Sequence, residues 1–125
     1  MNVVDSSGWL EYFASGPNAD FFATPIEETA ALVVPVLCLF EVFKRIIQQR
    51  TERAALEAAV AMQQGQVVDL TADLTLAAAR LSAREPLPMA DSIILATSRA
   101  YDATLWTQDA DFEGMAAVRY VAKQA

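Results

Sequence analysis

The sequence predicts a three-layer α/β fold in which helices flank a central parallel sheet of four to five strands. Short apolar segments rich in valine alternate with longer segments whose apolar residues follow helical spacing, a pattern typical of alternating strands and helices. The chain of 125 residues is 54% hydrophobic, which excludes a disordered protein and is sufficient for one core of ordinary size. We therefore expect residues 1–125 to form a single domain.

The first expected elements are a strand and two helices. The apolar strand Asn2–Val4 ends at Asp5. The Ser6–Ser7 pair can cap the following helix, whose apolar residues keep helical spacing until the Gly16–Pro17 pair interrupts the pattern. A second short helix is expected over residues 17–23.

The next elements are a buried strand and two longer helices. Ala30–Val34 is apolar and ends in β-branched residues, as strands often do. Pro35 lacks a backbone N–H, so it marks the end of this strand and the start of the helix Val36–Gln49. Thr51 can cap a further helix over Glu52–Gln64.

The carboxyl-terminal half repeats the alternation of strands and helices. The expected elements are the strand Gln66–Asp69, the helices Ala72–Arg84 and Met89–Tyr101, and the strands Ala103–Trp106 and Val118–Val121. Parallel strands joined by right-handed crossovers place their carboxyl ends at one edge of a sheet, where ligands of such folds bind. A functional site is therefore expected at that edge.

Several carboxylates are expected to gather there. Asp5 and Asp109 directly follow strands, Asp91 lies near a helix start, Glu41 interrupts an apolar helix, and Asp111 follows in the same acidic loop. Such groups would repel one another and raise each other's pKa values unless a cation neutralised them. The chain has no histidine, so a metal would be held by oxygen, which Mg²⁺ and Mn²⁺ prefer.

Each acid also has a purely structural explanation. Asp5 could cap a helix, and Asp91 could interact with the positive end of a helix dipole. Glu41 could pair with the basic residues three and four positions later in its helix. The acidic loop 109–111 could be a capped turn. The carboxylates favour a metal site only when they are considered together.

Composition limits the possible partners and location. The net charge of −7 argues against a nucleic-acid partner unless several carboxylates are neutralised in a metal site. No apolar run reaches the roughly 18 residues of a membrane span, and the amino terminus has no basic segment, so we expect neither a membrane partner nor a secretory signal. A single cysteine, Cys38, favours a reducing cytoplasm.

The chain resembles the PIN-domain ribonucleases and, by its size, the VapC-type toxins of prokaryotic type II toxin–antitoxin systems. The matching segments are VVDSSGWLEYF, PVLCLFEVFKR, ADSIILATSRAYDATLWTQDADFEG and the terminal VRYV. One departure is Trp106, where the family more usually has a smaller aliphatic residue. The resemblance implies a PIN-like version of the predicted fold, a homodimer, and inhibition by a cognate antitoxin that occupies the active-site groove.

The resemblance also implies a catalytic site. Asp5, Glu41, Asp91 and Asp109 would form a metal-binding and catalytic quartet, with Asp111 as an auxiliary acid. The implied cofactor is Mg²⁺, with Mn²⁺ as a plausible substitute. The implied reaction is the hydrolysis of RNA phosphodiester bonds by metal-activated water, which leaves a 5′-phosphate.

Further residues are expected beside these acids. Ser6 and Thr107 match positions where the family often has a small hydroxyl next to the site. Lys44 and Arg45, one turn beyond the helical glutamate, are candidate RNA-binding cations, and Arg99 is a further candidate. Lys44 and Arg45 could equally be solvated surface groups.

Two other functions compete with this interpretation. A catalytically silent PIN-like module could use the acids only to bind a basic antitoxin segment, although all four quartet acids are intact. A receiver-type phosphoacceptor domain also has acids at strand ends, but it needs paired acids after the first strand, where Asp5 is followed by Ser6 and Ser7. A phosphatase of the haloacid-dehalogenase type would need an aspartate in place of Ser7.

Overall fold

Five short parallel strands form two adjacent sheets in the computed structural model, which describes residues 1–124. The larger sheet has the strand order β1-β4-β5, and the smaller sheet pairs β2 with β3. The strands are β1 (Asn2–Val4), β2 (Val33–Pro35), β3 (Gln66–Val68), β4 (Thr104–Thr107) and β5 (Val118–Tyr120). A single parallel bridge between Asn2 and Leu32 connects the two sheets.

This arrangement corrects the expectation of one sheet with four to five strands. The fold class and the parallel pairing are as predicted, but the main sheet contains three strands. Each strand has only three or four residues, so β1 and β2 run side by side yet share one bridge instead of a ladder. The residues of the sheet edges are still brought together, because both sheets belong to the same core.

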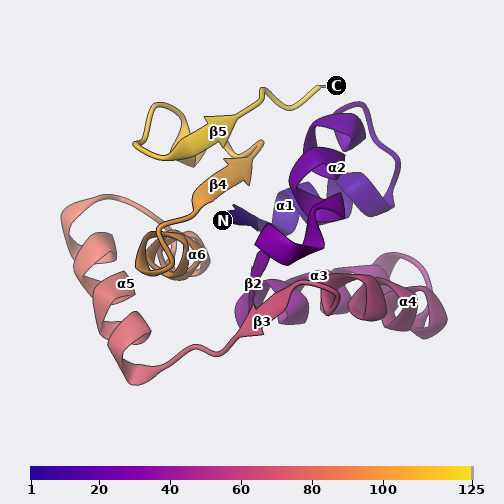
Figure 1. The fold of residues 1–125 in the computed structure, drawn as a ribbon, viewed down its shortest axis with the longest axis horizontal. Coiled ribbons are helices and arrows are strands. Elements are labelled where there is room, and N and C mark those ends of the chain that lie inside the picture. The colour runs from indigo at the N-terminus through magenta and orange to yellow at the C-terminus, as the bar shows by residue number, and fades with distance from the viewer. Residues whose placement is uncertain (125) are drawn as a thin grey trace.

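Helices lie on both sides of the strands, as the three-layer prediction requires. In Figure 1, α5 and α6 lie on one side, and α1 to α4 lie on the other. The helices are α1 (Ser6–Phe13), α2 (Ala19–Glu27), α3 (Val36–Gln49), α4 (Glu52–Met62), α5 (Ala72–Arg84) and α6 (Met89–Ala100). They pack as the pairs α1–α2, α3–α4 and α5–α6. None of the helices in the described chain is long and apolar enough to cross a membrane.

Most element boundaries agree with the sequence signals. The bounds of α3 and α5 are those predicted, and Thr51 and Thr71 cap α4 and α5 by accepting backbone N–H groups. The expected strand at 30–34 is partly wrong, because Thr29–Ala31 forms a 3₁₀ turn and β2 begins at Val33. Pro35 remains in β2 as its last residue, where a missing N–H is tolerated.

Trp106 fits the core of this chain despite its size. Its indole N–H donates to Asn2 Oδ1 at 2.9 Å, and its ring centroid lies 5.0 Å from that of Phe21. The Arg119 guanidinium lies 4.9 Å from the ring centroid on its face. The departure from the smaller residue usual in the family is therefore accommodated by polar, aromatic and cation–π contacts around the indole.

Gly8 allows the first helix to approach the core closely. A Cβ atom at this position would lie 2.5 Å from Phe22 Cε1 and 2.7 Å from Val4 Cγ1. Both neighbours are fully buried and cannot move aside without disturbing the core. The close packing of α1 fixes the start of this helix, which carries the first residues of the site.

Candidate metal centre and active site

The register of β1 and β4 brings the first acidic residue next to the second half of the chain. Val4 pairs with Trp106 in the parallel ladder, and the backbone N–H of Asp5 donates to the Trp106 carbonyl at 3.2 Å. Asp5 and Thr107 therefore lie side by side at the carboxyl ends of adjacent strands. This is the sheet edge at which the sequence predicted a site.

Asp5 is a buried carboxylate held by three hydrogen-bond donors. Its side chain is 3% exposed and accepts from the Gly8 N–H at 2.9 Å, from Ser7 Oγ at 2.9 Å and from Thr107 Oγ1 at 2.6 Å. Burial raises the pKa of Asp5 from 3.8 to about 6, although these hydrogen bonds act in the opposite direction. The donors hold the carboxylate in one orientation at the end of β1.

The expectation that the Ser6–Ser7 pair caps α1 is wrong. Asp5 is itself the N-cap, because its extended backbone lets the carboxylate reach the Gly8 N–H. The hydroxyls of Ser6 and Ser7 donate instead to Glu41 and Asp5. The structural role considered for Asp5 therefore coexists with its place in the acidic site.

Three carboxylates cluster beside Asp5. One ligand atom each from Asp91, Asp109 and Asp111 lies within 4.8 Å of the other two. Asp91 comes from the first turn of α6, whereas Asp109 and Asp111 belong to the loop after β4. The loop is held by two hydrogen bonds, from the Asp109 N–H to Thr107 Oγ1 and from the Asp111 N–H to Asp109 Oδ1, both at 2.9 Å.

The negative charges of this cluster have no basic partner. Burial, followed by the charges of Asp109, Asp111 and Asp5, raises the pKa of Asp91 from 3.8 to about 7. Between residues 1 and 124, one ion pair forms within 4.0 Å, and it joins Arg53 to Glu57 on the exposed face of α4. A hard divalent cation would relieve this repulsion, and the all-oxygen donor set suits Mg²⁺ or Mn²⁺.

Glu41 faces the same region but lies outside the three-carboxylate cluster. Its Oε1 accepts from Ser6 Oγ at 2.7 Å, and the ion pair considered with Lys44 or Arg45 does not form in the described chain. Burial, followed by the charges of Asp5 and Glu41, raises the pKa of the buried Cys38 thiol. Glu41 and Asp5 are therefore close enough to act on the same side chain.

The structure distributes the predicted site residues unevenly. Asp111, expected only as an auxiliary acid, lies in the cluster with two members of the quartet, whereas Asp5 and Glu41 lie around it. Thr107 and Ser6 both touch site carboxylates, as the resemblance implies. The metal ligands themselves remain a prediction.

Two of the three predicted RNA-binding cations, Lys44 and Arg45, line the same cavity, and the third lies elsewhere. Lys44 Nζ lies 5.8 Å from the centroid of the Phe40 ring, and Arg45 lines a cavity beside α1. Arg99 lies in the last turn of α6, at the opposite end of the helix from Asp91. Arg45 therefore lies beside Ser7, which holds Asp5, whereas Arg99 lies at the end of α6 away from Asp91.

Two site residues were not singled out from the sequence. Ser7 holds Asp5, and the buried Gln108 donates from Nε2 to the Ser7 carbonyl at 3.5 Å while its Oε1 accepts from Asn18 Nδ2 at 3.0 Å. The signals were the hydroxyl in the DSS triplet and the polar side chain between Thr107 and Asp109.

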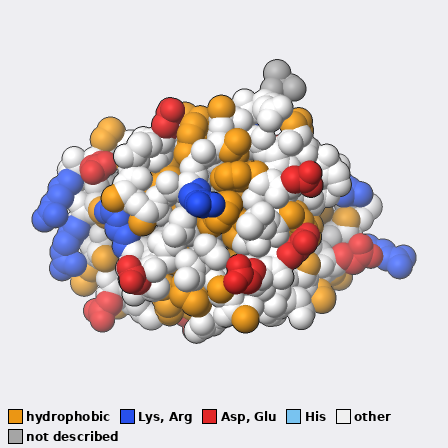
Figure 2. Space-filling view, turned by 45° about the horizontal axis from the view of Figure 1, so that its top comes forward, with side chains coloured by type: hydrophobic (Ala, Val, Ile, Leu, Met, Phe, Trp, Pro, Cys, Tyr) orange, Lys and Arg blue, Asp and Glu red, His pale blue; other side chains and the backbone are white. Residues whose placement is uncertain are grey.

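On the face of the molecule seen in Figure 2, the acidic side chains are scattered around a strip of hydrophobic ones.

Solved structures of other proteins share this fold. A toxin–antitoxin complex from Klebsiella pneumoniae matches with a TM-score of 0.81 and 18% identity, over 95% of this chain and 96% of that chain. VapC20 from Mycobacterium tuberculosis, described as a sarcin–ricin loop cleaving toxin, matches with a TM-score of 0.78 and 19% identity, over 93% and 95%. VapBC2 from Rickettsia felis, bound to a promoter DNA fragment, matches with a TM-score of 0.75 and 11% identity, over 97% of both chains.

Sequence comparison adds a family assignment to this likeness of fold. No curated protein sequence matches the chain. The sequence model of the PIN domain, however, matches residues 3–118, a span that includes the five carboxylates at the edge of the sheet. The chain therefore belongs to the PIN domain family.

Proposed function

We propose that this protein is a divalent-metal-dependent endoribonuclease and the toxin of a toxin–antitoxin pair. The observation that carries the proposal is the cluster of Asp91, Asp109 and Asp111, whose carboxylates crowd together without a basic partner in the described chain. Membership of the PIN domain family supports a nuclease. The similar structures include a toxin–antitoxin complex and a sarcin–ricin loop cleaving toxin, which support the biological role.

The acids at the sheet edge fit a metal cofactor by their chemistry. Asp91, Asp109 and Asp111 would hold the ion, with Asp5 and Glu41 completing the negative surroundings. When bound, such an ion lowers the pKa of a water molecule and offsets negative charge on the scissile phosphate. The raised pKa values of Asp5 and Asp91 indicate that a cation would stabilise the ionised forms of both groups.

The side chains near the acids favour water as the nucleophile. The chain has no histidine, and the one cysteine, Cys38, is fully buried with a raised thiol pKa. The hydroxyls of Ser7 and Thr107 both donate to Asp5. Their role is to orient that carboxylate, so hydrolysis by water remains the simplest chemistry for this site.

The partners follow from the same proposal. RNA is the substrate, and a cognate antitoxin whose basic segment enters the acidic site is the inhibitor. The resemblance to VapC-type toxins supports a homodimer of single-domain chains in the cytoplasm. The DNA in one of the similar complexes belongs to a toxin–antitoxin assembly, so we do not extend it to this chain alone.

The experiment is to replace Asp91 with Asn and to measure RNA cleavage in Mg²⁺. Asp91→Asn removes one charge from the cluster at nearly constant size, so cleavage should be lost while the fold is kept. The matched control is Asp102→Asn, an exposed aspartate just beyond the other end of α6, whose positive φ of 51° Asn also adopts readily. Asp102→Asn should cleave like the wild type.

Growth of a bacterial host provides the second readout. Expression of the wild type should arrest growth, co-expression of the neighbouring upstream reading frame should relieve the arrest, and Asp91→Asn should not arrest growth. Wild-type cleavage rates in Asp91→Asn would refute the site assignment. A wild type that binds its neighbour but cleaves no RNA would instead identify a silent partner-binding module.

A further inference from the structure

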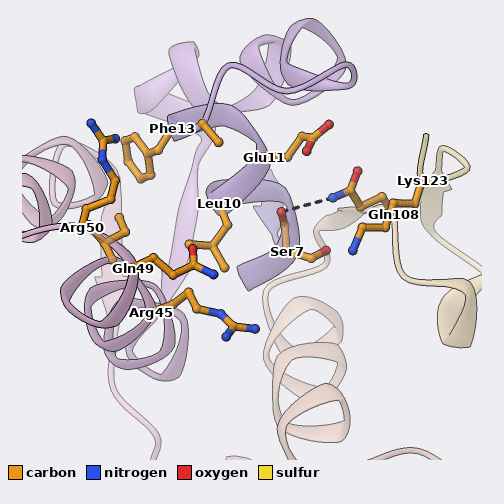
Figure 3. A pocket seen from close by; sticks show the side chains of 11 residues that line it. Ser7, Leu10, Glu11, Phe13, Arg45, Gln49, Arg50, Gln108 and Lys123 are labelled. Atoms are coloured by element: carbon orange, nitrogen blue, oxygen red, sulfur yellow. Dashed lines mark hydrogen bonds between the residues drawn. The ribbon is translucent and has the colours of Figure 1, made fainter. Parts of the chain in front are cut away.

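Two cavities follow the seam between α1 and α3, next to the acidic site. They measure about 350 and about 330 Å³, and Leu10 and Arg45 line both of them. The larger cavity, shown in Figure 3, reaches Ser7, whose hydroxyl donates to Asp5, and Gln108, whose side chain donates to the Ser7 carbonyl. The two cavities share Leu10 and Arg45, and we call them together the α1–α3 groove. Glu41 is the one acidic residue that lines the smaller cavity.

Basic side chains gather along this groove although the protein is acidic. Arg45, Arg50 and Lys123 line the larger cavity, and Lys44 joins Arg45 in the smaller one. These are four of the nine basic residues in a chain of net charge −7. None of the four has a carboxylate within 4.0 Å in the part of the chain that the structure describes. Their charges are available to an anionic ligand.

The remaining lining of the larger cavity does not cancel these charges. Glu11 is its one acidic member, and Glu11 Oε2 accepts the backbone N–H of Asn18 at 2.7 Å. Leu10 and Phe13 contribute apolar surface. The cavity volume lies in the range of about 300–1,000 Å³ that is usual for small-ligand sites.

The cations border the cavity instead of converging on one point. Figure 3 shows Arg45 and Arg50 on the α3 side, Lys123 on the opposite side, and Ser7 and Leu10 between them. A single small anion would need donors that meet at one place. Separated charges around an apolar floor suit a chain of phosphates with an unpaired base between them.

Resting on the ribonuclease function proposed above, we propose that the α1–α3 groove binds the single-stranded RNA on one side of the cleaved bond. Arg45, Arg50 and Lys123 contact the phosphates of this strand, and Leu10 and Phe13 support an unpaired base. A basic antitoxin segment would be repelled by these cations and attracted to the acids, so the groove and the acidic cluster bind ligands of opposite charge.

The test measures RNA binding in a variant that cannot cleave. A short fluorescent single-stranded RNA is titrated into Asp91→Asn in Mg²⁺ at several salt concentrations, and Arg45→Gln, Arg50→Gln and Lys123→Gln are added singly to this background. Each should weaken binding several-fold and reduce the slope of log K against log salt by about 0.7, the value for one phosphate contact on a single strand. The matched control, Arg80→Gln, removes an exposed charge from α5 and should leave the slope unchanged.

Steady-state cleavage separates binding from chemistry. In the otherwise wild-type protein, Arg45→Gln and Lys123→Gln should raise KM with little change in kcat, as expected for a contact made equally in the ground and transition states. Melting temperatures near that of the wild type would show that the variants are folded.

Two results would overturn the groove proposal, and each leaves a different conclusion. Slopes and KM values equal to those of Arg80→Gln, in a protein that cleaves RNA, would refute the groove and keep the ribonuclease. If RNA is neither bound nor cleaved and poly-glutamate binds in an Arg45-dependent manner, both proposals fail and the groove is a site for an acidic protein segment.

Discussion

The hydrogen bond from Thr107 to Asp5 offers a quantitative test of how the site is held. Thr107 is fully buried, its Oγ1 donates to Asp5 Oδ2 at 2.6 Å, and the same oxygen accepts the Asp109 N–H at 2.9 Å. Thr107→Val keeps the volume of the side chain and removes both contacts. It therefore isolates the polar role of one hydroxyl between two acidic residues.

The expected cost follows from the charge of the acceptor. A hydrogen bond to a charged group contributes about 1.5–3 kcal/mol, and the Asp109 N–H also loses its acceptor. Because Asp109 is partly exposed, water can replace that second contact, so we expect a loss of about 2–3 kcal/mol in the free energy of unfolding at pH 8. For a chain of this length, that loss lowers Tm by roughly 8–12 °C.

The pH dependence distinguishes this contact from ordinary packing. The pKa of Asp5 is about 6, so the carboxylate is ionised at pH 8 and mostly protonated at pH 5. The penalty of Thr107→Val should therefore shrink to about 1 kcal/mol at pH 5, where the acceptor is neutral. The assay is thermal unfolding of the metal-free protein at both pH values.

Thr97→Val is the matched control for this experiment. Thr97 is equally buried, but its hydroxyl donates to the Ile93 carbonyl at 2.8 Å inside α6 and meets no carboxylate. Its replacement should cost less than about 1 kcal/mol and should not depend on pH. Equal and pH-independent losses in the two variants would refute the idea that Thr107 stabilises an ionised Asp5.

Two further predictions concern the acids themselves. The pKa values of Asp5 and Asp91 are raised from 3.8 to about 6 and about 7, so the folded metal-free protein binds more protons than the unfolded chain between about pH 4 and 7. Its Tm should therefore fall as the pH rises through this window, and saturating Mg²⁺ should remove the fall. A Tm that depends on neither pH nor Mg²⁺ would contradict a shared carboxylate site. Asp111→Asn should weaken Mg²⁺ binding several-fold in calorimetry, whereas Glu113→Gln, an exposed acid outside the cluster, should not; equal effects would show that Asp111 is no ligand.

Local signals predicted much of the fold. Helical periodicity and the Thr71 cap agree with the bounds of α5, and Pro35, the last residue of β2, directly precedes α3. Local signals could not predict that the strands divide into two sheets. Each strand has only three or four residues, and its pairing depends on tertiary context. The 3₁₀ turn before β2 was missed for a related reason, since its alanines suit a helix or a buried strand equally well.

The candidate site was predictable in its chemistry and less so in its geometry. Carboxylates after strands and at a helix start indicate the edge on which they meet, so Asp5, Asp91 and Asp109 could be grouped from the sequence. The distances between these carboxylates depend on side-chain directions, which sequence patterns do not specify. Asp111 was therefore expected only as an auxiliary acid, although its carboxylate lies in one cluster with those of Asp91 and Asp109. Lys123 was not predicted to line the groove, because it follows the last strand and lies across the cavity from Arg45 only through the tertiary fold.

The net charge of −7 therefore excludes less than it suggests. Charges beyond about 8 Å are largely screened at physiological ionic strength, so a bound strand responds to the groups beside it and not to the total. At the sheet edge a divalent ion would neutralise much of the acidic cluster, and along the α1–α3 groove the nearest unpaired charges are those of Arg45, Arg50 and Lys123. On the proposals made above, an acidic protein would thus offer RNA a locally positive surface beside a metal-neutralised acidic site.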